Sequence, residues 1–115
     1  PQFTDIWATH WPYEAIRVWG DNISGTKIVN NTIVKADQYG DTAAIVVRGT
    51  VDLSTNLTIS GNIMDQVSGH GISLYGISNS IVSDNIMNIP TGKLGTYEYG
   101  GSGDNLIDDN IVTLN

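Results

Sequence analysis

Three side chains suited to ligand chemistry, Trp19, Arg48 and Tyr75, occupy the same place in similar strings, each directly before a glycine. Aromatic rings stack on the apolar C–H faces of sugars, and an arginine fork between them can hold a carboxylate or sulfate with two hydrogen bonds. Arg17 and Glu98 belong to a second series of matching places. We therefore expect Arg17, Trp19, Arg48, Tyr75 and Glu98 to form a substrate-binding face, although ordinary strand surfaces also favour such residues.

The elements that must position this face belong to an imperfect repeat that fills almost the whole chain. Each copy has short runs of alternating apolar residues, broken by Gly, Asn, Asp and Ser, which is typical of short strands between tight turns. A unit of about 25 residues with such strands indicates a solenoid whose strands pair one coil later. The sequence predicts one all-β domain over 1–115, with residues 1–14 entering from a preceding coil and coils at about 15–43, 44–70, 71–95 and 96–115.

Alternation within the first strand of each coil predicts which side chains point inward. Matching the copies places Ile72 over Tyr97 and Leu74 over Tyr99, so we expect both tyrosines inside and Glu98 outside. The expected outward columns are then Arg17, Val46, Ser73 and Glu98, and beside them Trp19, Arg48, Tyr75 and Gly100.

The second strand of each coil is less regular. If Leu57 and Ile59 point inward, their equivalents Ser80 and Asn105 either stack inside as polar side chains or indicate a register shifted by one residue. An asparagine recurs after this strand in strings of the type Ile-x-x-Asn-x-Ile, at Asn31, Asn62, Asn85 and Asn110. Asparagine tolerates left-handed backbone and its amide both donates and accepts, so stacked copies are expected to hydrogen-bond along the solenoid.

The Ile-x-x-Asn-x-Ile string resembles the repeat of right-handed parallel β-helix proteins of the pectin lyase-like superfamily, over nearly the whole chain. The resemblance implies that fold and contact with an acidic polysaccharide. The string Ile16-Arg17-Val18-Trp19-Gly20 is also similar to coils of alginate C5-epimerases and polysaccharide lyases. Their chemistry abstracts the proton next to a uronate carboxylate, which needs a base, an acid and a neutralising group. The resemblance implies His70, Tyr75 and Arg48 as the catalytic residues.

The Gly69-His70-Gly71 string is similar to that of polygalacturonase-type glycoside hydrolases. Hydrolysis needs two carboxylates across the scissile bond, and only Glu14 and Asp41 are candidates here. If the chain is an enzyme, lyase or epimerase chemistry is therefore favoured over hydrolysis. A single histidine beside turn glycines can equally be structural, so both the enzymatic and the non-catalytic interpretations stay open.

The non-catalytic alternative is a structural shaft or a receptor-binding module, as in phage tailspikes and surface adhesins. The sequence has no polar terminal unit at either end, and solenoids need such caps. We therefore expect an uncapped fragment of a longer solenoid, whose ends contact the remainder of a longer chain or form a homo-oligomer. Both interpretations place the protein outside the cell or on a virion or cell surface.

Composition excludes several classes of partner. Twelve Asp and Glu against five Lys and Arg give a formal charge of −7, which disfavours nucleic acid. No apolar run approaches the roughly 18 residues of a membrane span, so no membrane contact is expected. We expect no cofactor, with one exception: calcium could bind the acidic cluster Asp84, Asp104, Asp108 and Asp109, although turn aspartates exposed to water explain the cluster equally well.

Overall fold

The computed structural model describes residues 2–4, 7–9, 15–34, 43–49 and 53–115, and these residues form strands and turns without a helix. The first sheet contains β1 (Gln2–Thr4), β4 (Lys27–Val29), β8 (Thr58–Ser60), β12 (Ile81–Ser83) and β15 (Leu106–Asp108). The second contains β2 (Trp7–Thr9), β5 (Thr32–Val34), β9 (Ile63–Asp65), β13 (Ile86–Ile89) and β16 (Ile111–Leu114). The third contains β3 (Ile16–Gly20), β6 (Ala43–Gly49), β10 (His70–Tyr75) and β14 (Thr96–Tyr99), and a short pair joins β7 (Ser54–Thr55) to β11 (Ile77–Ser78).

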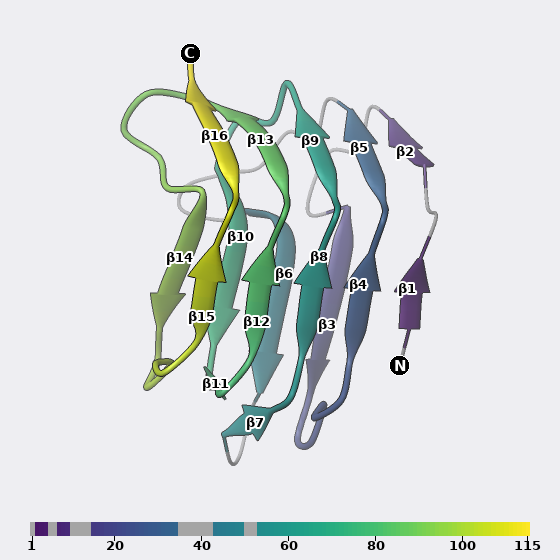
Figure 1. The fold of residues 1–115 in the computed structure, drawn as a ribbon, viewed down its shortest axis with the longest axis vertical. Coiled ribbons are helices and arrows are strands. Elements are labelled where there is room, and N and C mark those ends of the chain that lie inside the picture. The colour runs from purple at the N-terminus through teal and green to yellow at the C-terminus, as the bar shows by residue number, and fades with distance from the viewer. Residues whose placement is uncertain (1, 5–6, 10–14, 35–42, 50–52) are drawn as a thin grey trace.

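The sheets are the walls of one parallel β-solenoid of about four turns (Figure 1). Every strand pairs in parallel with its equivalent in a neighbouring coil, for example β4 with β8 and β8 with β12. In Figure 1 the coils advance from right to left, the strands of the first two sheets run upward near the viewer, and those of the third run downward behind them. The coil is therefore right-handed, and the predicted parallel β-helix is confirmed.

Two corners of each coil depend on a residue in the left-handed backbone region. The corner between the first and second sheets holds Asn30 (φ 59°), Gly61 (68°), Asp84 (56°) and Asp109 (55°). The corner before the first sheet holds Gly25 (79°), Asn56 (60°), Asn79 (49°) and Asp104 (54°). Gly, Asn and Asp are the residue types that adopt this conformation at low cost. The corners therefore explain why these residue types recur between the apolar runs.

The predicted asparagine ladder runs through the coils next to one of these corners. Asn62 Oδ1 accepts hydrogen bonds from the backbone N–H and from Nδ2 of Asn31, both at 3.0 Å. Asn85 Oδ1 accepts the same pair from Asn62 at 3.0 and 2.9 Å, and Asn110 Oδ1 accepts it from Asn85 at 3.0 and 2.9 Å. Because Asn31, Asn62 and Asn85 are fully buried, these bonds satisfy polar groups that water does not reach.

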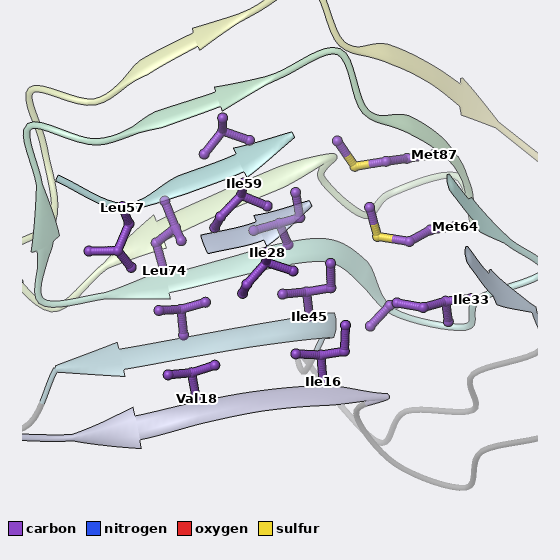
Figure 2. Close-up of a cluster of buried hydrophobic side chains, with 14 of the residues drawn as sticks. Ile16, Val18, Ile28, Ile33, Ile45, Leu57, Ile59, Met64, Leu74 and Met87 are labelled. Carbon is purple, nitrogen blue, oxygen red and sulfur yellow. The ribbon is translucent and has the colours of Figure 1, made fainter. Parts of the chain in front are cut away.

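The core is a set of apolar columns inside the solenoid, shown in Figure 2. Ile28 and Ile59 occupy equivalent positions on the first sheet, and Ile33 and Met64 do so on the second. All four are at most 1% exposed. Full burial of such a side chain contributes roughly 1.5–3 kcal/mol, so each coil is stabilised by stacking on its neighbours.

Polar side chains also stack inside, which settles the question of the second strand. Ser80 is 3% exposed, and its Oγ accepts from the backbone N–H of Leu57 at 3.0 Å while donating to Ser78 O at 2.9 Å. The backbone N–H of Ser80 in turn donates to Asn105 Oδ1 at 3.0 Å. The expected register was therefore right, and internal hydrogen bonds compensate the burial of these polar groups.

The predicted pairing of β14 with β10, which placed Ile72 over Tyr97, was wrong by one residue. Ile72 pairs with Thr96, a separation of 96 − 72 = 24, whereas Ile81 pairs with Leu106, a separation of 106 − 81 = 25. The difference arises because an extra residue stands after β14, where Gly100 and Gly101 both have positive φ (63° and 85°). A uniform shift of the sequence copies could not detect this local insertion.

The corrected register exchanges the inside and outside of β14. Tyr97 pairs with Ser73 and Tyr99 pairs with Tyr75, so both tyrosines belong to the outward columns, and Glu98 pairs with the buried Leu74. Glu98 is exposed because no coil covers it among the described residues, and its Oε2 accepts from Asn105 Nδ2 at 2.8 Å. Glu98 thus places a carboxylate at a position that Val18, Val47 and Leu74 occupy in the earlier coils.

Candidate binding face on the third sheet

The outer surface of the third sheet carries the predicted aromatic and arginine residues in adjacent columns. The pairing of β3 with β6, of β6 with β10 and of β10 with β14 aligns Trp19, Arg48, Tyr75 and Tyr99. The same pairing aligns Arg17, Val46, Ser73 and Tyr97 in the neighbouring column. The strands therefore bring together four of the five predicted binding residues, whereas Glu98 lies on the opposite side of β14.

Arginine and aromatic side chains in these columns contact one another directly. Arg17 Cζ lies 4.1 Å from the centroid of the Trp19 ring, and Arg48 Cζ lies 4.8 Å from the same ring. Arg48 Cζ is also 4.1 Å from the centroid of the Tyr75 ring. Arg48 is thus held between rings of the coils on either side of its own, an arrangement that cation–π attraction stabilises.

Rings of the last coil extend this series. The Tyr75 and Tyr99 centroids are 5.0 Å apart at 74°, an edge-to-face contact, and Tyr99 stacks on Tyr97 at 4.9 Å and 18°. Tyr97 stacks in turn on His70 at 4.7 Å and 20°. A continuous ring–guanidinium stack therefore runs across the sheet, formed by Arg17, Trp19, Arg48, Tyr75, Tyr99, Tyr97 and His70.

Mutual stacking determines what the face can offer a ligand. Apart from the edge-to-face contact between Tyr75 and Tyr99, the contacts within the stack use ring faces, so the groups left for a ligand are the remaining ring edges and the guanidinium N–H groups. Arg48 Nε is buried and has no hydrogen-bond partner in the part of the chain that the structure describes. Trp19 is 49% exposed and Tyr99 36%. Because aromatic edges and guanidinium N–H groups are all electropositive, the stack suits anionic groups better than the flat face of a sugar.

His70 has a geometry that differs from that of a general base. Its side chain is 5% exposed, and Nδ1 accepts a hydrogen bond from the backbone N–H of Leu94 at 2.8 Å. A backbone N–H can only donate, so Nδ1 must be unprotonated and its lone pair is engaged. In this neutral tautomer the proton is on Nε2. The imidazole therefore anchors the segment before β14 to the start of β10, which is the structural role considered above.

The acidic candidates from the sequence do not belong to the stack where the structure describes them. Glu14 and Asp41, the candidate carboxylates for hydrolysis, lie outside the described residues. Within the described ranges no three His, Asp or Glu side chains converge as a metal-binding group. Asp84, Asp104 and Asp109 instead occupy left-handed corners, and Asp108 Oδ1 accepts from the Asp109 N–H at 2.9 Å.

Comparison with protein-family models, with curated proteins and with solved structures finds no significant match. The resemblance to the pectin lyase-like superfamily therefore rests on the Ile-x-x-Asn-x-Ile string alone, and the structure itself shows a parallel β-solenoid of about four turns. In the described residues no helix is long and apolar enough to cross a membrane.

Sequence reasoning missed Tyr97 and Tyr99 as members of the face. The signal was present, because Tyr-x-Tyr precedes Gly100 as Tyr75 precedes Gly76. Aligning these glycines instead of the asparagines would have given the correct register. A Cβ added at Gly100 would overlap the Tyr75 ring, so the glycine leaves the space in which that ring packs.

Proposed function

We propose that the third sheet binds the carboxylate or sulfate groups of an acidic polysaccharide through the edges of the ring–guanidinium stack. The observation that carries the proposal is Arg48, a partly exposed residue of the outer column whose guanidinium lies between the Trp19 and Tyr75 rings. A guanidinium fork binds planar anions with two hydrogen bonds. Because ring contacts already restrict the side chain, little further conformational entropy is lost when an anion binds.

Spacing and charge support a polymeric ligand. Neighbouring coils are separated by about 4.8 Å, so Arg17 and Arg48, which lie on adjacent coils in neighbouring columns, can contact separate anionic groups of one polymer. Two of the five basic residues of an acidic chain gather at this face. The rest of the surface repels polyanions, so binding is expected to be confined to the stack and to weaken with salt.

Binding without turnover is the form of the proposal that the geometry favours. Proton abstraction next to a uronate carboxylate requires a base, and the Nδ1 lone pair of His70 is engaged by Leu94. Tyr75 and Arg48 contact each other, so an acid and a carboxylate-neutralising group are adjacent, but no carboxylate of the described residues belongs to the stack. Lyase or epimerase chemistry by His70, Tyr75 and Arg48 is the enzymatic alternative. A glycan-binding face of this kind would operate outside the cell or on a virion or cell surface.

A structural shaft is the second candidate, and one observation favours it. The members of the stack contact one another from Arg17 to His70, so the stack also reinforces the contact between coils without a ligand. If this were the only role of the stack, replacing Arg48 would lower the free energy of unfolding, and the parent protein would bind no polyanion.

Isothermal titration calorimetry with polygalacturonate, alginate, a sulfated dextran and neutral dextran tests the proposal. We expect binding of at least one polyanion and none of neutral dextran. Arg48→Gln should weaken that binding by about tenfold or more, since a hydrogen bond to a charged group is worth about 1.5–3 kcal/mol. Lys27→Gln, which removes the same charge from the exposed β4 on the first sheet, is the matched control. If the two substitutions weakened binding equally, the affinity would depend on net charge alone, which would contradict the proposal.

Proton NMR of the same polymers after incubation separates binding from turnover. Unchanged ligand signals with line broadening are expected. New unsaturated-ring or epimerised-sugar signals would instead establish the enzymatic alternative.

A further inference from the structure

The second sheet carries a row of exposed isoleucines on its outer surface. Ile86 pairs with Ile63 on one side and with Ile111 on the other, so these three residues, the isoleucine row, lie on the neighbouring strands β9, β13 and β16 (Figure 1). Ile63 and Ile86 are 43% and 41% exposed, although a described coil adjoins each of them on both sides. Their exposure therefore belongs to the lateral surface of the solenoid.

The coil does not need isoleucine at this position to fold. The partner of Ile63 in the coil before is Thr32, which is also β-branched but polar, and β-branched residues of either kind suit a strand. The core is formed instead by the next residues along the strands, Met64 and Met87, which are 0% exposed. A single exposed apolar side chain is ordinary, whereas side chains about 4.8 Å apart on successive coils form a continuous apolar strip.

Carboxylates flank the isoleucine row on both sides. Asp84 and Asp109 are exposed and occupy the left-handed corner, each two residues before an isoleucine of the row. Asp65 lies on the other side, two residues after Ile63, and is partly exposed. No Lys or Arg among the described residues occupies either flanking column. The surface is therefore an apolar strip between two lines of negative charge.

We propose that the isoleucine row docks a basic amphipathic α-helix of another protein, with the helix axis along the solenoid axis. Side chains on one face of a helix recur about every 5.4 Å, and those on one face of a strand about every 6.7 Å. Over the two coil intervals of the row, at about 4.8 Å each, the helix departs from the row by about 1 Å and the strand by about 4 Å. The spacing therefore favours a helix.

The flanking charges determine the rest of the partner. Apolar residues at i, i+4 and i+7 of the helix would contact successive isoleucines, while Lys or Arg beside them extend to the carboxylates. A second copy of this chain matches less well, because two such faces in contact would bring acidic lines together and the described residues include no helix. This site is separate from the ring–guanidinium stack, which is on the third sheet.

Fluorescence anisotropy with a labelled model peptide tests the proposal. The probe is a peptide of about 18 residues of Ala, Leu and Lys, with Leu along one stripe and Lys on both sides of it. We expect the parent protein to bind this peptide, and the affinity to fall as salt is added. A peptide of the same composition in scrambled order should bind about tenfold more weakly, because its apolar and basic residues do not share one helical face.

Substitutions in the protein separate the apolar contribution from general hydrophobicity. Ile86→Thr introduces the residue type that Thr32 places in the same column, so the variant should fold and bind the peptide about fivefold more weakly. Leu53→Thr is the matched control, since Leu53 is 54% exposed but lies outside the row, and it should leave the affinity unchanged.

A second pair of substitutions tests the charges. Asp84→Asn should weaken binding about threefold and reduce its salt dependence, and it should fold because Asn30 adopts the same backbone conformation (φ 59° against 56°). Asp104→Asn removes the same charge at the corner before the first sheet, where Asn79 also has positive φ, and should not change the affinity.

Three results would overturn the proposal. The first is that the patterned peptide binds no better than the scrambled one. The second is that Ile86→Thr and Leu53→Thr, or Asp84→Asn and Asp104→Asn, have equal effects on binding. The third is that the parent protein self-associates in sedimentation and Ile86→Thr abolishes this, since a second copy would then occupy the row.

Discussion

Replacement of Asn85 by alanine tests the physical basis of the solenoid. Asn85 is fully buried, and its Oδ1 accepts from the Asn62 backbone N–H and Nδ2 at 3.0 and 2.9 Å. Its Nδ2 donates to Ile59 O at 3.0 Å and to Asn110 Oδ1 at 2.9 Å. Asn85→Ala removes the side-chain partner of the Asn62 N–H, of Asn62 Nδ2 and of Ile59 O, whereas Asn110 Oδ1 keeps the backbone N–H of residue 85. Each unsatisfied buried group costs about 1–3 kcal/mol.

The expected loss of stability is below the simple sum. The space left by the side chain can admit water that satisfies part of these groups, and Asn110 is partly exposed. We therefore expect Asn85→Ala to lower the free energy of unfolding by about 3–5 kcal/mol, a large share of the roughly 5–15 kcal/mol of an ordinary domain.

The matched control is Asn110→Ala, which removes the same amide at the partly exposed ladder position among the described residues. The donors that it releases, the N–H and Nδ2 of Asn85, would then be close to solvent, so a loss of about 1 kcal/mol is expected. Urea unfolding followed by circular dichroism measures both variants, with an unchanged m-value as the check that the transition is comparable. A loss under about 1 kcal/mol for Asn85→Ala, or equal losses for the two variants, would refute the buried-ladder argument.

Three further substitutions test the binding face and its supports. Gly100→Ala should lower the free energy of unfolding by about 2–4 kcal/mol, since the new Cβ overlaps the Tyr75 ring and φ is positive. Gly25→Ala is the control, because φ is also positive there but no atom lies within 4 Å of the new Cβ. It should cost only about 1 kcal/mol in the same urea assay. His70→Asn keeps an acceptor near the position of Nδ1, so it should melt at a higher temperature than His70→Ala; equal Tm values would argue against the structural hydrogen bond. Glu98→Gln should leave polyanion binding within about twofold of the parent in calorimetry, because the side chain points away from the stack, and a large change would return Glu98 to the binding face.

The fold could be predicted from the sequence because each residue type that recurs in the repeat has a physical role in a coil. Strings around Asn31 and Asn62 combine inward Ile, a left-handed corner and an amide that bonds along the axis. Each feature alone is common, but their recurrence at coil spacing leaves few other folds. The ladder, the parallel pairing and the internal position of Ser80 were therefore predictable.

The candidate face could be predicted only in part. Trp19, Arg48 and Tyr75 share a column because their strands keep a constant offset from glycine. The insertion after Tyr99 changes the offset by one residue, and a one-residue slip reverses inside and outside. Stacking of the rings and guanidiniums on one another could not be read from the sequence, because it depends on side-chain rotamers and on the distance between coils.

The ladder spacing has a consequence for how the chain folds. Its hydrogen bonds join residues 31, 23 and 25 positions apart, so each coil must close a loop of that length before it gains contacts. With 115 residues this corresponds to a relative contact order of about 0.2, in the range of slowly folding proteins. The ladder does not connect coils that are not neighbours, so folding should propagate from one nucleated pair of coils. Mechanical or chemical unfolding should then proceed coil by coil.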